Sequence, residues 1–189
     1  MTGFFGGLEQ LPLAPSLEPS AIVADTDPFL FTSTSIAVPL AGTLLLRRMN
    51  STGGLSSNFN MYVTNAGAVM TGVFAALVNL TGQFIAQTAD RSADAALVAN
   101  GALWSPPWIN PPNVPVGDLY GAILIATATT LPLFRCFAAS DPATCNLGRT
   151  AAAGNLEVAS GPAGLSVLPA NVNMATLGLS ARSLWMAAT

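Results

Sequence analysis

Residues 72–78 (GVFAALV) would carry apolar side chains on both faces of a β-strand. Alternate residues point to opposite sides, with Val73, Ala75 and Leu77 on one side and Phe74, Ala76 and Val78 on the other. A strand with one face in water shows polar residues at every second position. We therefore expect either a central covered strand, or a sandwich core on one side and a second subunit or covering arm on the other. Phe74, Ala76 and Val78 are the candidate subunit interface.

The polar residues 79–82 (NLTG) separate this run from a second apolar run at residues 83–88. Four residues are a common loop length between two paired strands, so the two runs are predicted to form a hairpin. Each run is far shorter than the roughly 18 apolar residues of a spanning helix, and no membrane insertion is expected. The first residues carry no basic stretch before an apolar one, so no signal peptide is expected either.

Further short apolar segments occur along the chain, separated by turn residues. The clearest strand candidates besides the hairpin are residues 43–49, 58–64, 118–130, 131–139 and 183–189. Residues 89–101 suit one helical turn or a surface loop. Many short strands with turn signals between them predict an all-β fold, a jelly-roll-like antiparallel β-sandwich over residues 36–189. Residues 1–35 contain four prolines and irregularly spaced apolar residues. They predict an extended amino-terminal arm with room for one short strand, which would contact a neighbouring subunit or wrap its own domain.

The chain is unusually poor in charge. Charged residues make up 8% of its 189 residues, against about 25% in an average soluble domain. Such a surface suits a chain that is packed into a larger assembly, because charge normally keeps free proteins dispersed. The net charge is −3, and the six basic residues are all arginines scattered along the sequence except for Arg47 and Arg48. Nucleic acid is therefore not an expected partner.

Catalytic chemistry has few residues to draw on. The chain has no histidine, which removes the commonest general base and zinc ligand. The pairs Asp25/Asp27 and Asp90/Asp94 could hold Ca²⁺ or flank a glycosidic bond, but they more simply predict loop solvation and turn caps. No phosphate-binding loop or Gly-x-Ser-x-Gly motif is present. We predict no catalytic, cofactor-binding or metal-binding residues and no enzyme activity.

Two other pairs of residues leave alternatives open. Cys136 and Cys145 enclose eight residues and either form a disulfide or remain two thiols. Trp104 and Trp108 lie in the proline-dense segment 101–118, where they either stack on sugar rings or anchor the loop to the sandwich. In the sugar-binding alternative, Tyr120 would join them as a glycan contact. The glycosylation sequons at Asn50 and Asn79 are interpreted as turn residues.

The order of these elements resembles the β-sandwich domains of tailed-bacteriophage virion proteins, in particular minor tail, fibre and head-decoration proteins of phages that infect actinobacteria. The similar stretches are GTLLLRRMN (42–50), GVFAALVNLTGQFIAQTAD (72–90), NVPVGDLYGAILIATATTLPLF (113–134) and SLWMAAT (183–189). The approach from Val114 to Tyr120 has one residue more than the family's Val-Pro-x-Gly-x-Tyr pattern. The proline-dense loop, the cysteine pair and the apolar arm depart from that family.

The resemblance implies a structural virion subunit, often trimeric and sometimes in contact with host glycans, without catalytic residues. We therefore predict a minor tail protein of the tail tip or fibre that forms a homotrimer, binds other virion proteins and is assembled in the host cytoplasm. A capsid decoration or head-fibre protein is the first alternative. A carbohydrate-binding module that recognises a host receptor is the second.

Overall fold

The computed structural model describes residues 22–26, 36–37, 40–136, 156–180 and 184–189. In these residues the regular structure consists of antiparallel strands and two short 3₁₀ helices, η3 (Ala95–Val98) and η5 (Met174–Thr176). The strands are β1 (Ala24–Asp25), β2 (Ile36–Ala37), β3 (Leu45–Ser51), β4 (Gly54–Leu55), β5 (Phe59–Asn65), β6 (Ala68–Val78), β7 (Phe84–Gln87), β8 (Ala102–Trp104), β9 (Asn113–Val114), β10 (Gly117–Thr130), β11 (Leu133–Arg135), β12 (Val158–Ser160), β13 (Gly178–Leu179) and β14 (Ala187–Ala188). The predicted all-β sandwich is confirmed, while its jelly-roll connectivity stays a prediction.

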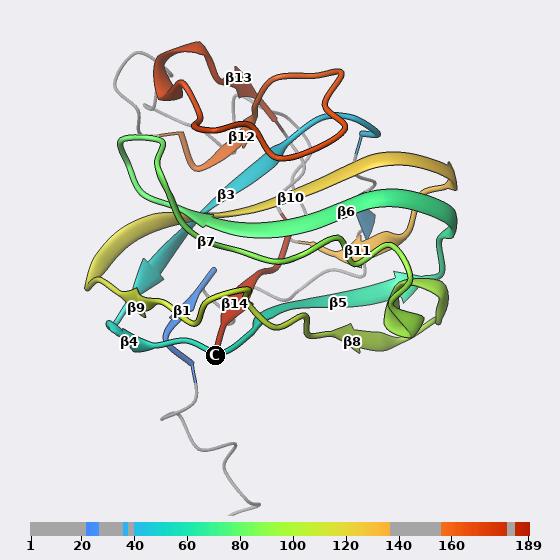
Figure 1. Ribbon diagram of the computed structural model, residues 1–189, viewed down its shortest axis with the longest axis horizontal. Helices are drawn as coiled ribbons and strands as arrows, with labels where there is room; N and C mark the ends of the chain where they lie inside the picture. The colour runs from blue at the N-terminus through green and yellow to red at the C-terminus, as the bar shows by residue number, and fades with distance from the viewer. Residues whose placement is uncertain (1–21, 27–35, 38–39, 137–155, 181–183) are drawn as a thin grey trace, which may run out of the picture.

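Nine of these strands follow one hydrogen-bonded path, β2-β11-β5-β14-β1-β3-β10-β6-β7, in which β14 and β1 join two layers along one side. β8, β12 and β13 pair beside this path, and β4 and β9 form a separate two-stranded sheet. One layer contains β3, β10, β6 and β7, and the other contains β5, β8 and β11 (Figure 1). The longest strands, β6 and β10, pair over most of their length, from Tyr120 opposite Val78 to Thr130 opposite Ala68. A main core fills the space between the layers, and it includes Val73, Ala75 and Leu77 of β6.

A third layer covers the outer face of β3, β10 and β6. β12 pairs with the edge of β3, and the chain that follows it folds back across the sheet (Figure 1). Leu156, Val172, Met174 and Leu177 pack in a second core against outward-facing side chains of β6 and β10. We call residues 156–180 the covering segment. Both faces of β6 are thus covered from residue 73 to residue 78 within one chain, so this part of β6 is the central covered strand that the sequence predicted as one alternative.

Part of the predicted amino-terminal arm belongs to the sandwich. β1 lies between β14 and β3, with Ala24 opposite both Ala188 and Ser51. Val23 and Ala24 are members of the main core. The boundary drawn at residue 35 is therefore wrong for residues 22–26, because a two-residue strand gives no periodic pattern to read. Residues 1–21 and 27–35 lie outside the described part of the chain.

The other expected strands are found within a few residues of their predicted bounds. The hairpin β6–β7 starts four residues earlier than predicted, at Ala68, and β3 starts two residues later, at Leu45. The segment 131–139 gives only β11, and its residues from 137 onwards are not described. The carboxy-terminal strand is shorter than predicted, because β14 spans only Ala187–Ala188.

The turn between β6 and β7 fastens the covering segment to the hairpin. The side-chain Oδ1 of Asn79 accepts hydrogen bonds from the backbone N–H groups of Thr81 and Gln83, at 3.0 and 2.9 Å. The Gly82 carbonyl accepts a hydrogen bond from the Val172 N–H at 2.8 Å. Gly82 has φ +89°, and a Cβ placed on it would lie 1.8 Å from the Val172 oxygen. Only glycine fits this contact.

We expect Gly82→Ala to lower the free energy of unfolding by about 2–5 kcal/mol, because a left-handed backbone costs about 1–2 kcal/mol and overpacking adds about 1–3. Gly164→Ala is the matched control, since Gly164 has φ +73° and open space around its Cβ position. The control should lose only the backbone contribution. Urea unfolding of both variants measures the difference, and equal losses would show that Gly82 and Val172 are not in close contact.

Candidate functional site

Most of the described charge gathers in one place. Nine charged residues fall in the described part of the chain, and five of them line one groove of about 200 Å³. These five are Asp25, Arg47, Arg48, Asp118 and Glu157. They come from β1, β3, the start of β10 and the residue before β12. The sheet register brings them together, because Asn50 of β3 lies opposite both Asp25 and Asp118.

The two arginines are held by carboxylates on different segments. Arg47 Nη1 lies 3.1 Å from Glu157 Oε1, and the two side chains are only 12% and 25% exposed. Arg48 contacts the carboxylate of Asp118, which also accepts a hydrogen bond from Asn50 Nδ2 at 3.3 Å. Burial alone would lower the pKa of Arg48, but the hydrogen bond and negative charge of Asp118 outweigh it and raise that pKa. Arg48 therefore stays charged at every physiological pH.

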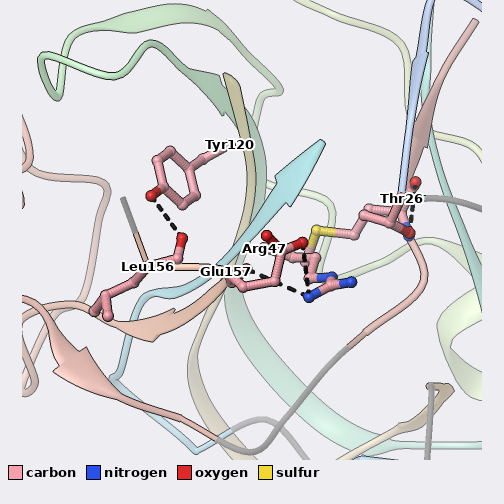
Figure 2. A network of polar contacts seen from close by, with 6 residues as sticks. Thr26, Arg47, Tyr120, Leu156 and Glu157 are labelled. Atoms are coloured by element: carbon pink, nitrogen blue, oxygen red, sulfur yellow. Dashed lines mark hydrogen bonds and ion pairs between the residues drawn. The ribbon is translucent and has the colours of Figure 1, made fainter. Parts of the chain in front are cut away.

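These contacts hold the start of the covering segment. Figure 2 shows Arg47 beside Glu157, with the Tyr120 hydroxyl pointing to the carbonyl of the preceding residue, Leu156. Tyr120 donates this hydrogen bond at 2.7 Å from a fully buried position on β10. Two successive residues of the covering segment are thus fixed to β3 and β10. The Arg47–Glu157 ion pair attaches the covering segment to β3, and the Arg48–Asp118 ion pair links β3 to β10.

The aromatic residues considered for glycan binding are buried. Trp104, Trp108 and Tyr120 are only 1%, 4% and 0% exposed. Trp104 Nε1 donates to Asp94 at 2.9 Å, and Trp108 Nε1 donates to Ser56 Oγ at 2.8 Å. Both indole rings also pack edge-on against Phe59 in the core. Their rings have no face open to a sugar, so the glycan interpretation of these three residues is wrong and the anchor interpretation holds.

The residues considered for a subunit interface lie under the chain's own covering segment. Ala76 and Val78 are fully buried in the second core, and Phe74 is half-buried at its border. The sequence left open whether a second subunit or a covering segment lies over this face. Residues 156–180 occupy it, so Ala76 and Val78 are not available to another molecule in this conformation.

The remaining candidates from the sequence are the cysteine pair and the aspartate pair. Cys136 is buried next to Leu184, and Cys145 lies outside the described residues, so the predicted disulfide stays a prediction. Asp90 and Asp94 act separately: Asp90 accepts hydrogen bonds from backbone N–H groups, and Asp94 accepts one from Trp104. Within the described ranges, no three His, Cys, Asp or Glu side chains lie close enough to hold a metal ion.

The described surface is rich in apolar side chains that sequence periodicity did not single out. Eleven large apolar residues are exposed: Ile22, Leu40, Leu55, Val69, Leu80, Val98, Leu103, Ile109, Val116, Val167 and Leu179. The most exposed is Val116, at 79%, which lies just after β9. Leu55 is 69% exposed and lies on β4, the strand that pairs with β9. Most of them lie in loops and very short strands, where an apolar residue breaks no pattern; Val69 near the start of β6 and Val98 in η3 are the exceptions.

No family model, curated protein or solved structure matches the chain. None of the helices in the described segments is long and apolar enough to cross a membrane. The class that the structure defines is an antiparallel β-sandwich with an additional covering layer. The resemblance to virion sandwiches stays a prediction that rests on the sequence.

Asp90 gives the fold a dependence on pH. Its carboxylate accepts hydrogen bonds from the N–H groups of Val73 and Ser92, at 3.0 and 2.9 Å, and a longer one from Gly72. Burial alone would raise the pKa of Asp90, but these donors outweigh it and lower that pKa below its ordinary value. The carboxylate therefore stabilises the fold above the pKa of the unfolded chain, and this stabilisation is lost as the pH falls through the lower folded pKa.

We expect Asp90→Asn to be less stable than the unmodified chain near neutral pH and to approach it in acid. The amide keeps one acceptor oxygen but not the negative charge that attracts the three N–H groups. Because Asp90 is solvent-exposed, the effect should be modest. Urea midpoints measured at several pH values test this, and parallel pH profiles of the two proteins would contradict it.

Proposed function

We propose that this chain is a structural subunit of a tailed-bacteriophage virion, a minor tail protein of the tail tip or fibre that assembles as a homo-oligomer. The observation that carries the proposal is the surface: the described residues expose eleven large apolar side chains, while five of their nine charged residues are gathered in one groove. Single exposed apolar residues are common on free proteins. The shortage of charge around them is what favours an assembled state.

The polar groups of the described residues also support a structural role. Asp94 anchors Trp104, Asp118 holds Arg48, and Glu157 holds Arg47. The carboxylates that an enzyme would need for acid and base catalysis are here partners of structural donors. Polar contacts that fasten strands, turns and layers to one another favour a rigid chain, which suits a particle component.

The tail location comes from the sequence resemblance alone. A capsid decoration or head-fibre protein would have use for the same weakly charged surface, and it is the alternative proposal. The carbohydrate-binding alternative loses its residues, because Trp104, Trp108 and Tyr120 are buried. A homotrimer is the assembly that the resemblance favours.

We expect the purified chain to sediment as a trimer of 19.2 kDa subunits, and its association to depend little on salt. Contacts between uncharged surfaces are not screened by ions, whereas contacts between charged ones are. Sedimentation velocity over a range of protein and salt concentrations measures both properties. A monomer at every concentration would contradict the proposed assembly, and dissociation by salt would contradict its apolar character.

We expect an antibody against the chain to label the tail end of phage particles in negative-stain images. Particles treated with an antibody against the major capsid protein provide the control for head labelling. Label on the head would replace the tail proposal with the decoration alternative. Particles that lack the chain altogether, despite its expression during infection, would contradict a virion role of either kind.

A further inference from the structure

β7 is an edge strand beside an open groove. Among the described residues it pairs only with β6, and it ends the path of paired strands. A groove of about 490 Å³ lies along its outer side. An exposed strand edge presents unpaired N–H and C=O groups, which can accept a further strand. The carbonyl of Gln87 at the end of β7 is already bonded to the Ile109 N–H, so the remaining edge has room for an added strand of about three residues, roughly 10 Å long.

The backbone of β7 forms one side of this groove. Thr88 directs its groups inward, since its N–H donates to the Ala75 carbonyl at 3.0 Å. Because backbone groups alternate along a strand, the neighbouring Gln87 points outward, and its carbonyl accepts a hydrogen bond from the Ile109 N–H at 3.0 Å. Ile85 has no register partner on β6, because the pairing passes from Ala86–Leu77 directly to Phe84–Val78. Ile85 is the extra residue of a bulge and lines the groove.

Two segments wall the groove and keep it open between them. Ile109 and Asn110 stand on one side, and residues 168–170 of the covering segment stand on the other. Each segment is bonded at a different end of the hairpin, through Gln87 to Ile109 and through Gly82 to Val172. No charged side chain lines the groove, and polar groups, including the side chains of Gln87 and Asn110, are among its lining. Its occupant should therefore be extended and uncharged, with backbone groups that can pair with β7.

We propose that this groove accepts residues 3–8 (GFFGGL) of a second copy of the chain, added to β7 as a further strand. This inference rests on the proposed function, because it supplies the contact between subunits of the assembly. Residues 3–8 carry no charge and hold two adjacent phenylalanines, one of which can face the sandwich when the segment is extended. The next apolar stretch, residues 11–15, contains two prolines, which cannot donate to a strand edge.

The length of chain before the sandwich permits this contact. Fourteen residue steps separate residue 8 from Ile22, the first described residue. Fully extended, they span about 46–50 Å, which is enough to reach an adjacent subunit. The same length could also reach the chain's own β7, which lies four strands from β1 and therefore about 19 Å away. The experiment must separate these two arrangements.

Four full-length variants test the contact. Ala170→Arg places a long charged side chain in the wall of the groove, and Ala163→Arg places it at another exposed alanine of the covering segment that does not line the groove. The double variant Phe4→Asp/Phe5→Asp disables the inserted segment, and Thr2→Asp/Ser16→Asp adds the same charge outside residues 3–8 and serves as its control. Sedimentation velocity should show at least about tenfold weaker assembly for the first member of each pair and no change for its control.

Mixing the two defective variants distinguishes exchange between copies from insertion within one chain. The Phe4→Asp/Phe5→Asp chain keeps an intact groove, and the Ala170→Arg chain keeps an intact segment. If copies exchange the segment, the mixture should form a one-to-one complex that neither variant forms alone. No complex in the mixture, with both variants dissociated, would overturn the second-copy occupant.

Hydrogen exchange tests whether the contact is an added strand. The amide of Ile85 should exchange at least about tenfold more slowly in the assembled chain than in the dissociated Ala170→Arg variant. Unchanged exchange at Ile85 would overturn strand addition. Assembly that all four variants retain would overturn the inference and leave the proposed function standing, whereas a monomeric unmodified chain would contradict the proposed function itself. Near-ultraviolet circular dichroism must first show that each variant keeps its packed core.

Discussion

The burial of both faces of the β6–β10 pair is the constraint on which the rest of the structure depends. On the inner face, Gly121 lies opposite Leu77, and a Cβ on Gly121 would come within 2.5 Å of Met49 Sδ. On the outer face, Ala122 lies opposite Ala76. These small residues let both neighbouring layers approach the sheet closely. Without a third layer, the outer face would expose a continuous apolar surface, which favours aggregation.

Because the outer face of this sheet needs a cover, polar contacts attach the covering segment to it. A covering segment with little regular structure gains little from backbone pairing, so it needs fixed points of attachment. Tyr120 and Arg47 hold its beginning, and Gly82 holds it near Val172. A partly exposed ion pair contributes little free energy, commonly below about 1 kcal/mol. The burial of apolar groups therefore supplies the stability of this layer, and the polar contacts set its position on the sheet.

The sequence predicted the parts of the fold that have a period. Alternation and turn residues located β3, β5, β10 and the β6–β7 hairpin, and the apolar residues on both faces of β6 correctly required a cover. The cover itself could not be identified, because Val172, Met174 and Leu177 are irregularly spaced in a segment that has only short strands and a 3₁₀ turn. The one short strand expected in residues 1–35 could not be located for the same reason, and the structure places β1 at Ala24–Asp25. For Trp104 and Trp108, the sequence alone could not show whether the indole rings point into the core or outward into solvent.

The candidate site was less predictable than the fold, because its charged residues are far apart in the sequence. Arg47 and Arg48 were visible as an adjacent pair, but their partners Glu157 and Asp118 are 110 and 70 residues away. Only the register of β3 with β10 and β12 brings them together. The adjacent arginines suggested a strand end in solvent, whereas one of them secures a buried layer.

This arrangement also limits where another molecule can bind. The inner face of the β3–β10–β6 sheet is occupied by the second sheet, and its outer face is occupied by the covering segment. In the proposed assembly, contacts with other subunits would therefore avoid both faces of this sheet and use other parts of the surface, such as the strand edges and loops where the exposed apolar residues Leu55, Ile109 and Val116 are found. Edge contacts depend on backbone geometry more than on side-chain identity. A subunit that assembles in this way can therefore vary much of its surface sequence while keeping its interfaces, provided that the strand edges and the loops beside them keep their shape.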